Sequence, residues 1–174
     1  MRREEIPSVL GLEQGLVRLH SPTPLWGELY QQEAARIKTA LPQLLGLEHI
    51  GSTAIPGIKA KPILDMMAGI SNLDDALQCK DALEALGYKH ATQIVIERDV
   101  VFTRGEAWTH LLHVVEYGSK QWFCNLRFRD RLRHEPPLAA EYERLKERLS
   151  QEFSQNRAEY TKAKAAFIQN VVFG

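Results

Sequence analysis

Hydrophobic side chains recur at helical spacing between Pro24 and Pro42. Thr23 is well suited to cap a helix, and Pro24 fits a first helical turn because its missing N–H is not needed there. Pro42 cannot continue a helix, so the pattern predicts a helix over 24–41. The apolar positions that define its buried face are Trp26, Leu29, Tyr30, Ile37 and Leu41.

Two short apolar runs follow, 44–50 and 62–70, each bounded by turn-forming residues. Runs of this length are typical of buried strands. After them, Ser71 and Asp74 have the spacing of a capping box, and Gly87 suits the end of a helix. The pattern therefore predicts two strands and then a helix.

The second half of the chain begins with two segments rich in β-branched and aromatic residues, 93–104 and 108–117. A short polar turn separates them, which predicts a strand pair. Helical spacing then predicts three helices, over 119–133, 136–149 and 156–171. This order of elements favours an α+β fold, in which helices flank a mixed β-sheet and the C-terminal part is helical.

The chain has 174 residues and a mass of 19.8 kDa, which fits one domain of about 100–200 residues. We expect a single domain over 1–174, with a sheet-containing core over about 20–118 and helices over about 119–173. Hydrophobic residues make up 44% and charged residues 25%, which excludes a disordered chain. Cys79 and Cys124 are too few for a disulfide framework.

No apolar run approaches the roughly 20 residues that span a bilayer, and the longest, 63–70, contains Asp65. Glu4, Glu5 and Glu13 break up the start of the chain, which therefore lacks the continuous apolar run of a secretory signal. We expect a cytoplasmic protein with no membrane partner.

Charge is balanced over the whole chain, with 22 basic and 22 acidic residues. A protein that binds nucleic acid through its overall field is usually basic, so nucleic acid is not an expected partner. From residue 119 to the end, 11 Lys and Arg residues stand against 7 Asp and Glu residues. This local excess suits an anionic ligand, although a solvated helix face explains most of these charges.

Asp65 interrupts the most apolar strand of the chain. A carboxylate in such a strand costs several kcal/mol unless it is paired, bound to a metal or placed at a strand end open to solvent. A structural explanation is a bond to a neighbouring backbone N–H or to an Arg. The functional explanation, a ligand-binding carboxylate, is favoured by what precedes it.

A Gly51-Ser52-Thr53 turn lies at the end of the preceding strand. Glycine lets the chain approach a ligand closely, and hydroxyl and backbone N–H groups can hold phosphate oxygens. Many such sequences are plain turns. With Lys59 and Lys61 nearby, the turn is a candidate phosphate-binding site.

Three cations fall on the predicted buried faces of the C-terminal helices, namely Arg129, Arg133 and Lys164. A buried cation needs an anion or an aqueous cleft, and a phosphate ligand would satisfy all three. Extension of the side chain to solvent, or pairing with Asp130 or Glu116, explains any one of them equally well.

His110 and His113 share the strand predicted over 108–117. Residues three apart in a strand point to opposite faces, so these two cannot form a metal pair. Only one of them can join Asp65, and His113 is the candidate catalytic residue. A lone His in a strand is more often a hydrogen-bonded structural residue.

The run from His49 to Asp65, HIGSTAIPGIKAKPILD, resembles the signature of the GrpB-like family. The resemblance covers roughly 18–170. It continues through Leu112–Glu116, Phe128–Asp130, Leu132, Arg133, Tyr160, Lys164, Phe167 and Ile168. By similarity this family is placed in the nucleotidyltransferase superfamily, whose fold is a mixed sheet flanked by helices.

The resemblance implies roles for several residues. Gly51 and Ser52 would cradle nucleotide phosphates, and Asp65 would bind Mg²⁺ or Mn²⁺ for nucleotidyl or phosphoryl transfer, since such ions prefer oxygen ligands. Glu116 is the nearest candidate for a further metal-binding acid. Candidates for the phosphate-binding shell, besides Thr53, are Lys59, Lys61, Arg129, Arg133 and Lys164.

The sequence departs from the superfamily pattern at two places. Active nucleotidyltransferases usually carry two acids separated by one residue, whereas Ile63 and Met67 flank Asp65 here. GrpB-like chains often carry His-x-His before Val114, and Leu111 takes the first of those positions. One carboxylate and one imidazole of the pattern are therefore missing.

Three hypotheses about function follow. The first is a nucleotidyltransferase-like protein that binds a nucleotide or another phosphorylated small molecule and performs metal-dependent transfer. The second is a non-catalytic phosphate- or nucleotide-binding regulatory module. In the third, Asp65 merely pairs with Arg129 or Lys164, and the basic helices bind a partner.

Overall fold

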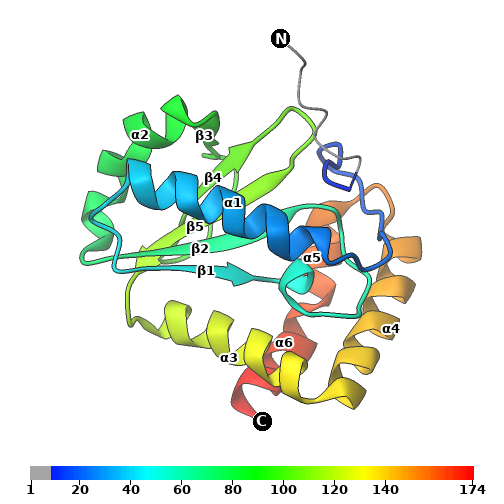
Figure 1. Cartoon of the computed structure of the whole chain (residues 1–174). Helices are drawn as coiled ribbons and strands as arrows, with labels where there is room; N and C mark the ends of the chain where they lie inside the picture. Colours follow the sequence, from blue (N-terminus) through cyan, green and yellow to red (C-terminus); the bar gives the residue numbers. More distant parts are fainter. Residues whose placement is uncertain (1–8) are drawn as a thin grey trace.

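The computed structural model describes residues 9–174, which form one mixed sheet with helices on both faces (Figure 1). Glu4 and Glu5 lie outside the described residues. The strands are β1 (Gly46–Ile50), β2 (Leu64–Ile70), β3 (Tyr88–His90), β4 (Val100–Arg104) and β5 (His110–Glu116). The α-helices are α1 (Leu25–Ala40), α2 (Lys80–Ala85), α3 (Lys120–His134), α4 (Pro136–Glu152), α5 (Arg157–Ala163) and α6 (Ala165–Phe173), and two 3₁₀ helices are η1 (Ser52–Ala54) and η2 (Leu73–Cys79). The predicted α+β architecture is confirmed.

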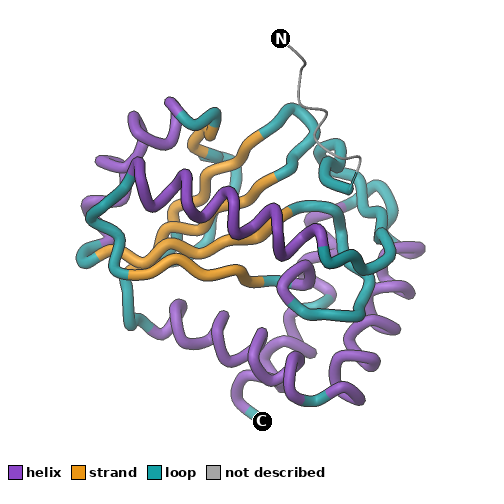
Figure 2. Tube along the Cα trace, viewed as in Figure 1, coloured by secondary structure: helices purple, strands orange, loops and turns teal. Residues whose placement is uncertain are grey.

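The strands lie in the order β1-β2-β5-β4-β3, and Figure 2 shows them as one twisted layer. β2 and β5 are parallel, and every other neighbouring pair is antiparallel. In the register, Ile50 lies opposite Asp65, and Met67 lies opposite His113. Because side chains alternate between faces, Asp65 and His113 belong to the same face of the sheet.

One face of the sheet is covered by α1, η2 and α2, and α1 crosses the strands in Figure 1. Met66 and Leu112 point into this layer and are fully buried against Ile37 of α1 and Leu83 of α2. This contact buries the apolar stripe of the first predicted helix.

The opposite face is covered at one end by α3. Trp122 packs against Met67 and Val115 there. It approaches the sheet closely because Gly46 and Gly69 carry no side chain, and a Cβ at either position would lie within 3.0 Å of a Trp122 ring carbon. At the other end of this face Asp65, Leu111 and His113 keep part of their surface exposed.

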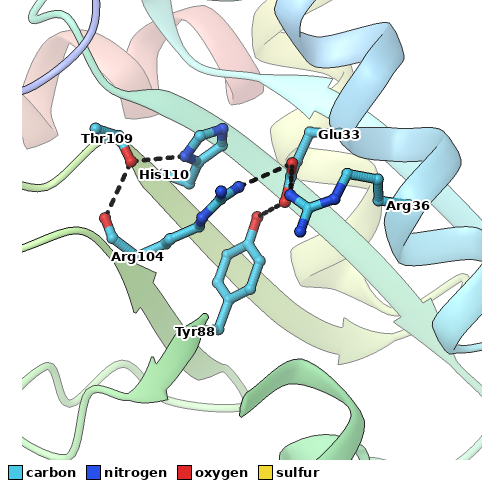
Figure 3. A network of polar contacts seen from close by, with 6 residues as sticks. All are labelled: Glu33, Arg36, Tyr88, Arg104, Thr109 and His110. Carbon is cyan, nitrogen blue, oxygen red and sulfur yellow. Dashed lines mark hydrogen bonds and ion pairs between the residues drawn. The ribbon is translucent and has the colours of Figure 1, made fainter. Parts of the chain in front are cut away.

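A network of charged and polar groups lies on the α1 side of the sheet (Figure 3). Buried Glu33 of α1 accepts hydrogen bonds from Tyr88 at 2.8 Å, Arg36 at 2.7 Å and Arg104 at 3.0 Å. Burial raises the pKa of Glu33, but the Tyr88 hydrogen bond and the nearby cations outweigh burial and lower it overall. This network ties α1 to β3 and β4.

Four local predictions are wrong in detail. Residues 93–99 form turns rather than a strand, and β4 begins only at Val100. The short strand β3 was not predicted. Asn72 rather than Ser71 caps η2, with its side chain accepting the Asp74 N–H at 3.0 Å. The helix predicted over 156–171 breaks at Lys164 into α5 and α6.

Within residues 9–174, no helix is both long enough and apolar enough to cross a bilayer.

Candidate anion site at Asp65

Asp65 lies near the start of β2, directly beside the turn that follows β1. Gly51 has a φ of +69°, and a Cβ on it would lie 2.6 Å from Asp65 Oδ2. Both the backbone conformation and the space therefore require glycine at this position. The turn and the carboxylate, predicted from sequence to act together, are in contact.

Cations from three segments lie close enough to Asp65 to interact with its charge. Lys61 precedes β2, Arg157 begins α5, and Lys164 lies where α5 meets α6. The charge of Asp65 acts on all three, favouring their protonated forms. Among the described residues, however, none of the three has a carboxylate oxygen within 4.0 Å, so the cluster carries excess positive charge without close ion pairing.

Burial disfavours the protonated form of Lys61 and Lys164. It lowers the pKa of Lys61 to about 7, with the charge of Lys164 adding to the effect and Asp65 opposing it. Burial likewise lowers the pKa of Lys164 to about 8, again opposed by Asp65. The two ammonium groups lie over the ring of Tyr160, with Nζ 5.4 Å and 4.5 Å from its centroid.

Two donors in this cluster have no acceptor within the described part of the chain. Nη1 of Arg157 and the hydroxyl of Tyr160 are buried and lack a hydrogen-bond partner there. The other guanidinium nitrogens of Arg157 donate to the carbonyl oxygens of Leu16 and Glu13. Buried donors are nearly always satisfied in proteins, so an acceptor from outside the described residues, such as an ordered water or a ligand, would complete these hydrogen bonds.

Lys146 and Tyr142 of α4 extend the cluster. Lys146 is 1% exposed, donates to the carbonyl oxygen of Lys59 and lies 4.8 Å from the centroid of the Tyr142 ring. Burial, with the charge of Lys164, lowers its pKa to about 7. Burial also raises the pKa of Tyr142, and the neighbouring Ser52 side chain partly opposes that rise. The candidate phosphate-binding serine therefore faces this side of the turn.

His113 stands on the same face as Asp65. Its Nδ1 lies 2.6 Å from Oδ2 of Asp99, a residue in the turn before β4. Burial lowers the pKa of His113, but the hydrogen bond and charge of Asp99, together with the charge of Asp65, raise it overall.

The remaining predicted phosphate ligands lie outside this cluster. Arg129 is buried but neutralised by Glu48 at 2.6 Å and Asp130 at 2.8 Å. Lys59 pairs with Glu147. Pairing, the alternative explanation for inward-facing cations, therefore holds for Arg129.

Thr53 and Arg133 border a different cavity, of about 560 Å³, which Trp26 and Ile55 also line. Thr53 Oγ1 lies 2.9 Å from Nε2 of His49, on the α1 side of the sheet. Arg133, predicted on a buried face, is exposed and donates through Nε to the Ala54 carbonyl oxygen at 2.8 Å. Consecutive residues of the turn thus face separate sites.

The residues around Asp65 do not fit a protein-held divalent metal. Glu116 lies at the far end of β5, on the opposite face from His113, and pairs with Arg98 at 3.1 Å. Residues 9–174 contain no group of three His, Cys, Asp or Glu side chains placed to hold a metal ion. The ammonium groups near the single carboxylate would repel a dication, and the structure does not bring the expected ligands of Mg²⁺ or Mn²⁺ together.

Comparison with known proteins settles the family. Residues 16–172 match the family described as GrpB protein. The chain belongs to that family. A glutamate-rich protein GrpB of Alkalihalophilus pseudofirmus is 33% identical over 171 residues, covering 94% of this chain and 98% of that protein.

The GrpB fold is also shared with a solved structure. The crystal structure of the conserved protein GrpB from Enterococcus faecalis superposes with a TM-score of 0.80 at 29% identity, covering 88% of this chain and 94% of that one. A dephospho-CoA kinase of Mycolicibacterium paratuberculosis is 36% identical over 90 residues, covering 48% of this chain and 22% of that protein.

Several members of the cluster in this GrpB chain were not predicted from sequence. Lys146 follows Tyr142 by four residues and so shares its buried helix face, a signal of the kind that identified Lys164. Arg157 and Tyr160 occupy the first turn of α5, where a cation and a phenol are unremarkable in a sequence. Asp99 gave no signal, because it lies in a turn that the sequence predicts as strand.

Proposed function

We propose that this protein binds the phosphate group of a nucleotide or another phosphorylated small molecule at the Asp65 cluster. The proposal rests chiefly on Lys61, Lys164 and Arg157, three partly buried cations that interact with the charge of one carboxylate. Unbalanced buried charge is costly, and a phosphate dianion would offset it. Nη1 of Arg157 and the Tyr160 hydroxyl would donate to its oxygens.

The arrangement supports binding without a protein-held metal, which favours the second hypothesis over metal-dependent nucleotidyl transfer. Ammonium and guanidinium groups neutralise phosphate directly, a task that a divalent ion performs in metal-dependent enzymes.

Thermal unfolding with ATP, ADP, pyrophosphate and inorganic phosphate, each in excess EDTA, tests the proposal. A ligand at 100 times its Kd stabilises the folded state by about 2.7 kcal/mol. We expect stabilisation in EDTA by at least one of these anions, and its loss in Lys164→Met. The matched control is Lys162→Met, which replaces an exposed lysine of α5 two residues away and should respond like the wild type. No stabilisation by any anion refutes the proposal.

A further inference from the structure

Asp99 and His113 form a hydrogen-bonded pair in which the carboxylate is buried. The Asp99 side chain is 1% exposed and gives Oδ2 to Nδ1 of His113 at 2.6 Å. Its other oxygen, Oδ1, is buried without a hydrogen-bond partner among the described residues. A buried carboxylate oxygen without a hydrogen-bond partner is expensive, so the arrangement calls for an explanation besides stability.

The turn that carries Asp99 is strained. Arg98 has a φ of +61°, the left-handed region that side chains other than glycine rarely adopt. A bridge between Ile96 and Asp99 closes the turn, and an ion pair between Arg98 and Glu116 at 3.1 Å ties it to β5. Strain of this kind persists when the surrounding structure enforces it, often at functional sites.

His113 connects this turn to the Asp65 cluster. The two side chains share one face of the sheet, and the charge of Asp65 acts on the imidazole. Asp65 and Asp99 are the titratable groups that act on His113 within the described chain. Within the described residues, the contact with Asp99 is the one hydrogen bond of the His113 ring. The His113 side chain is 15% exposed, and its Nε2 is left available for a ligand.

We propose that Asp99 is a positioning residue that holds the His113 proton on Nδ1, so that Nε2 takes a proton from the phosphate group bound at the Asp65 cluster. The proton passes from a singly protonated phosphate group to Nε2. The products are an imidazolium ring, which lies between Asp99 and the ligand, and a phosphate dianion. An acceptor carboxylate on one ring nitrogen fixes the tautomer and makes the other nitrogen the proton acceptor. This inference rests on the proposed function and adds a proton-exchanging group to it.

The test is NMR of protein labelled with ¹⁵N at histidine, with His113 assigned by the missing signal in His113→Gln. Near pH 9, the neutral ring should show the proton on Nδ1. In Asp99→Asn the amide can donate to Nδ1, so the proton should move to Nε2. Pyrophosphate in EDTA should shift the Nε2 signal toward the imidazolium value. His134, an exposed residue at the end of α3 whose Nδ1 contacts the carbonyl oxygen of Asp130, is the internal control.

The outcomes separate the two proposals. If pyrophosphate stabilises the protein but leaves the His113 signals unmoved, phosphate binding stands and the role of His113 is refuted. A wild-type ring with its proton on Nε2 also refutes it, whether or not Asp99→Asn folds. If none of the four anions stabilises the protein and pyrophosphate leaves the His113 signals unmoved, both proposals fail.

Discussion

Replacement of Lys164 with Met is expected to stabilise the free protein while removing phosphate binding. The pKa of Lys164 falls from its ordinary 10.5 to about 8, chiefly through burial. At about 1.36 kcal/mol per pKa unit, keeping the ammonium charged at pH 7 costs about 3 kcal/mol. Loss of its contact with the Tyr160 ring offsets about 1–2 kcal/mol of this. The net gain is about 1–2 kcal/mol.

Urea and thermal unfolding at pH 7 measure this gain. For a protein of this size, 1 kcal/mol corresponds to about 2–4 °C in Tm. Lys162→Met, in which an exposed lysine is replaced, should stay within about 0.5 kcal/mol of the wild type.

The pH dependence gives a second readout. In the window between about 8 and 10.5 the unfolded chain binds more protons at Lys164 than the folded chain, so this residue makes stability rise with pH. The penalty is fully present below the folded pKa and disappears above the unfolded one. Lys164→Met should flatten that rise. If the substitution instead destabilises the protein at pH 7 and leaves the rise unchanged, Lys164 is not a strained buried cation and the reasoning fails.

Three further substitutions test other parts of the structure. Gly51→Ala should cost about 2 kcal/mol in urea unfolding and abolish pyrophosphate binding, since it places a Cβ against Asp65 at positive φ; unchanged binding would show that the turn does not shape the site. Glu33→Gln should cost about 3 kcal/mol at pH 7, because it disrupts a buried ion network. The pKa of Glu33 is lowered in the folded state, so its stabilisation is present above the ordinary glutamate pKa and lost as pH falls through the folded value; the variant should lose stability less steeply in acid, and an unchanged acid limb would contradict this. Gly69→Ala should cost about 1–3 kcal/mol by overpacking against Trp122, and wild-type stability would show that α3 can shift.

The sequence predicted the elements that have long periodic patterns. α1, β2 and α3 appear close to their expected limits because each has an apolar face or run that must be buried. The strand β3, with three residues, is too short to leave a pattern. The break between α5 and α6 follows no proline or glycine, so periodicity alone could not place it.

The candidate site was predictable in part. Helical spacing identified Lys164 as a cation on a buried face, and the structure places it in the cluster. The same reasoning selected Arg129, but Glu48 neutralises it. Helical spacing could not predict this pairing, because the face of β1 that turns toward α3 depends on sheet register. Arg157 joins the cluster only through the packing of α5 against the segment at Leu16, a contact between distant parts of the chain.

Calorimetry of pyrophosphate binding at pH 8 in EDTA, repeated in buffers of different ionisation enthalpy, tests the central claim most directly. An anion bound among lysines whose pKa values lie near 7 and 8 should raise those values, so binding should take up protons from the buffer. Uptake should fall in Lys61→Met. Binding without proton uptake, or no binding at all, would contradict the assignment of this cluster as a phosphate site.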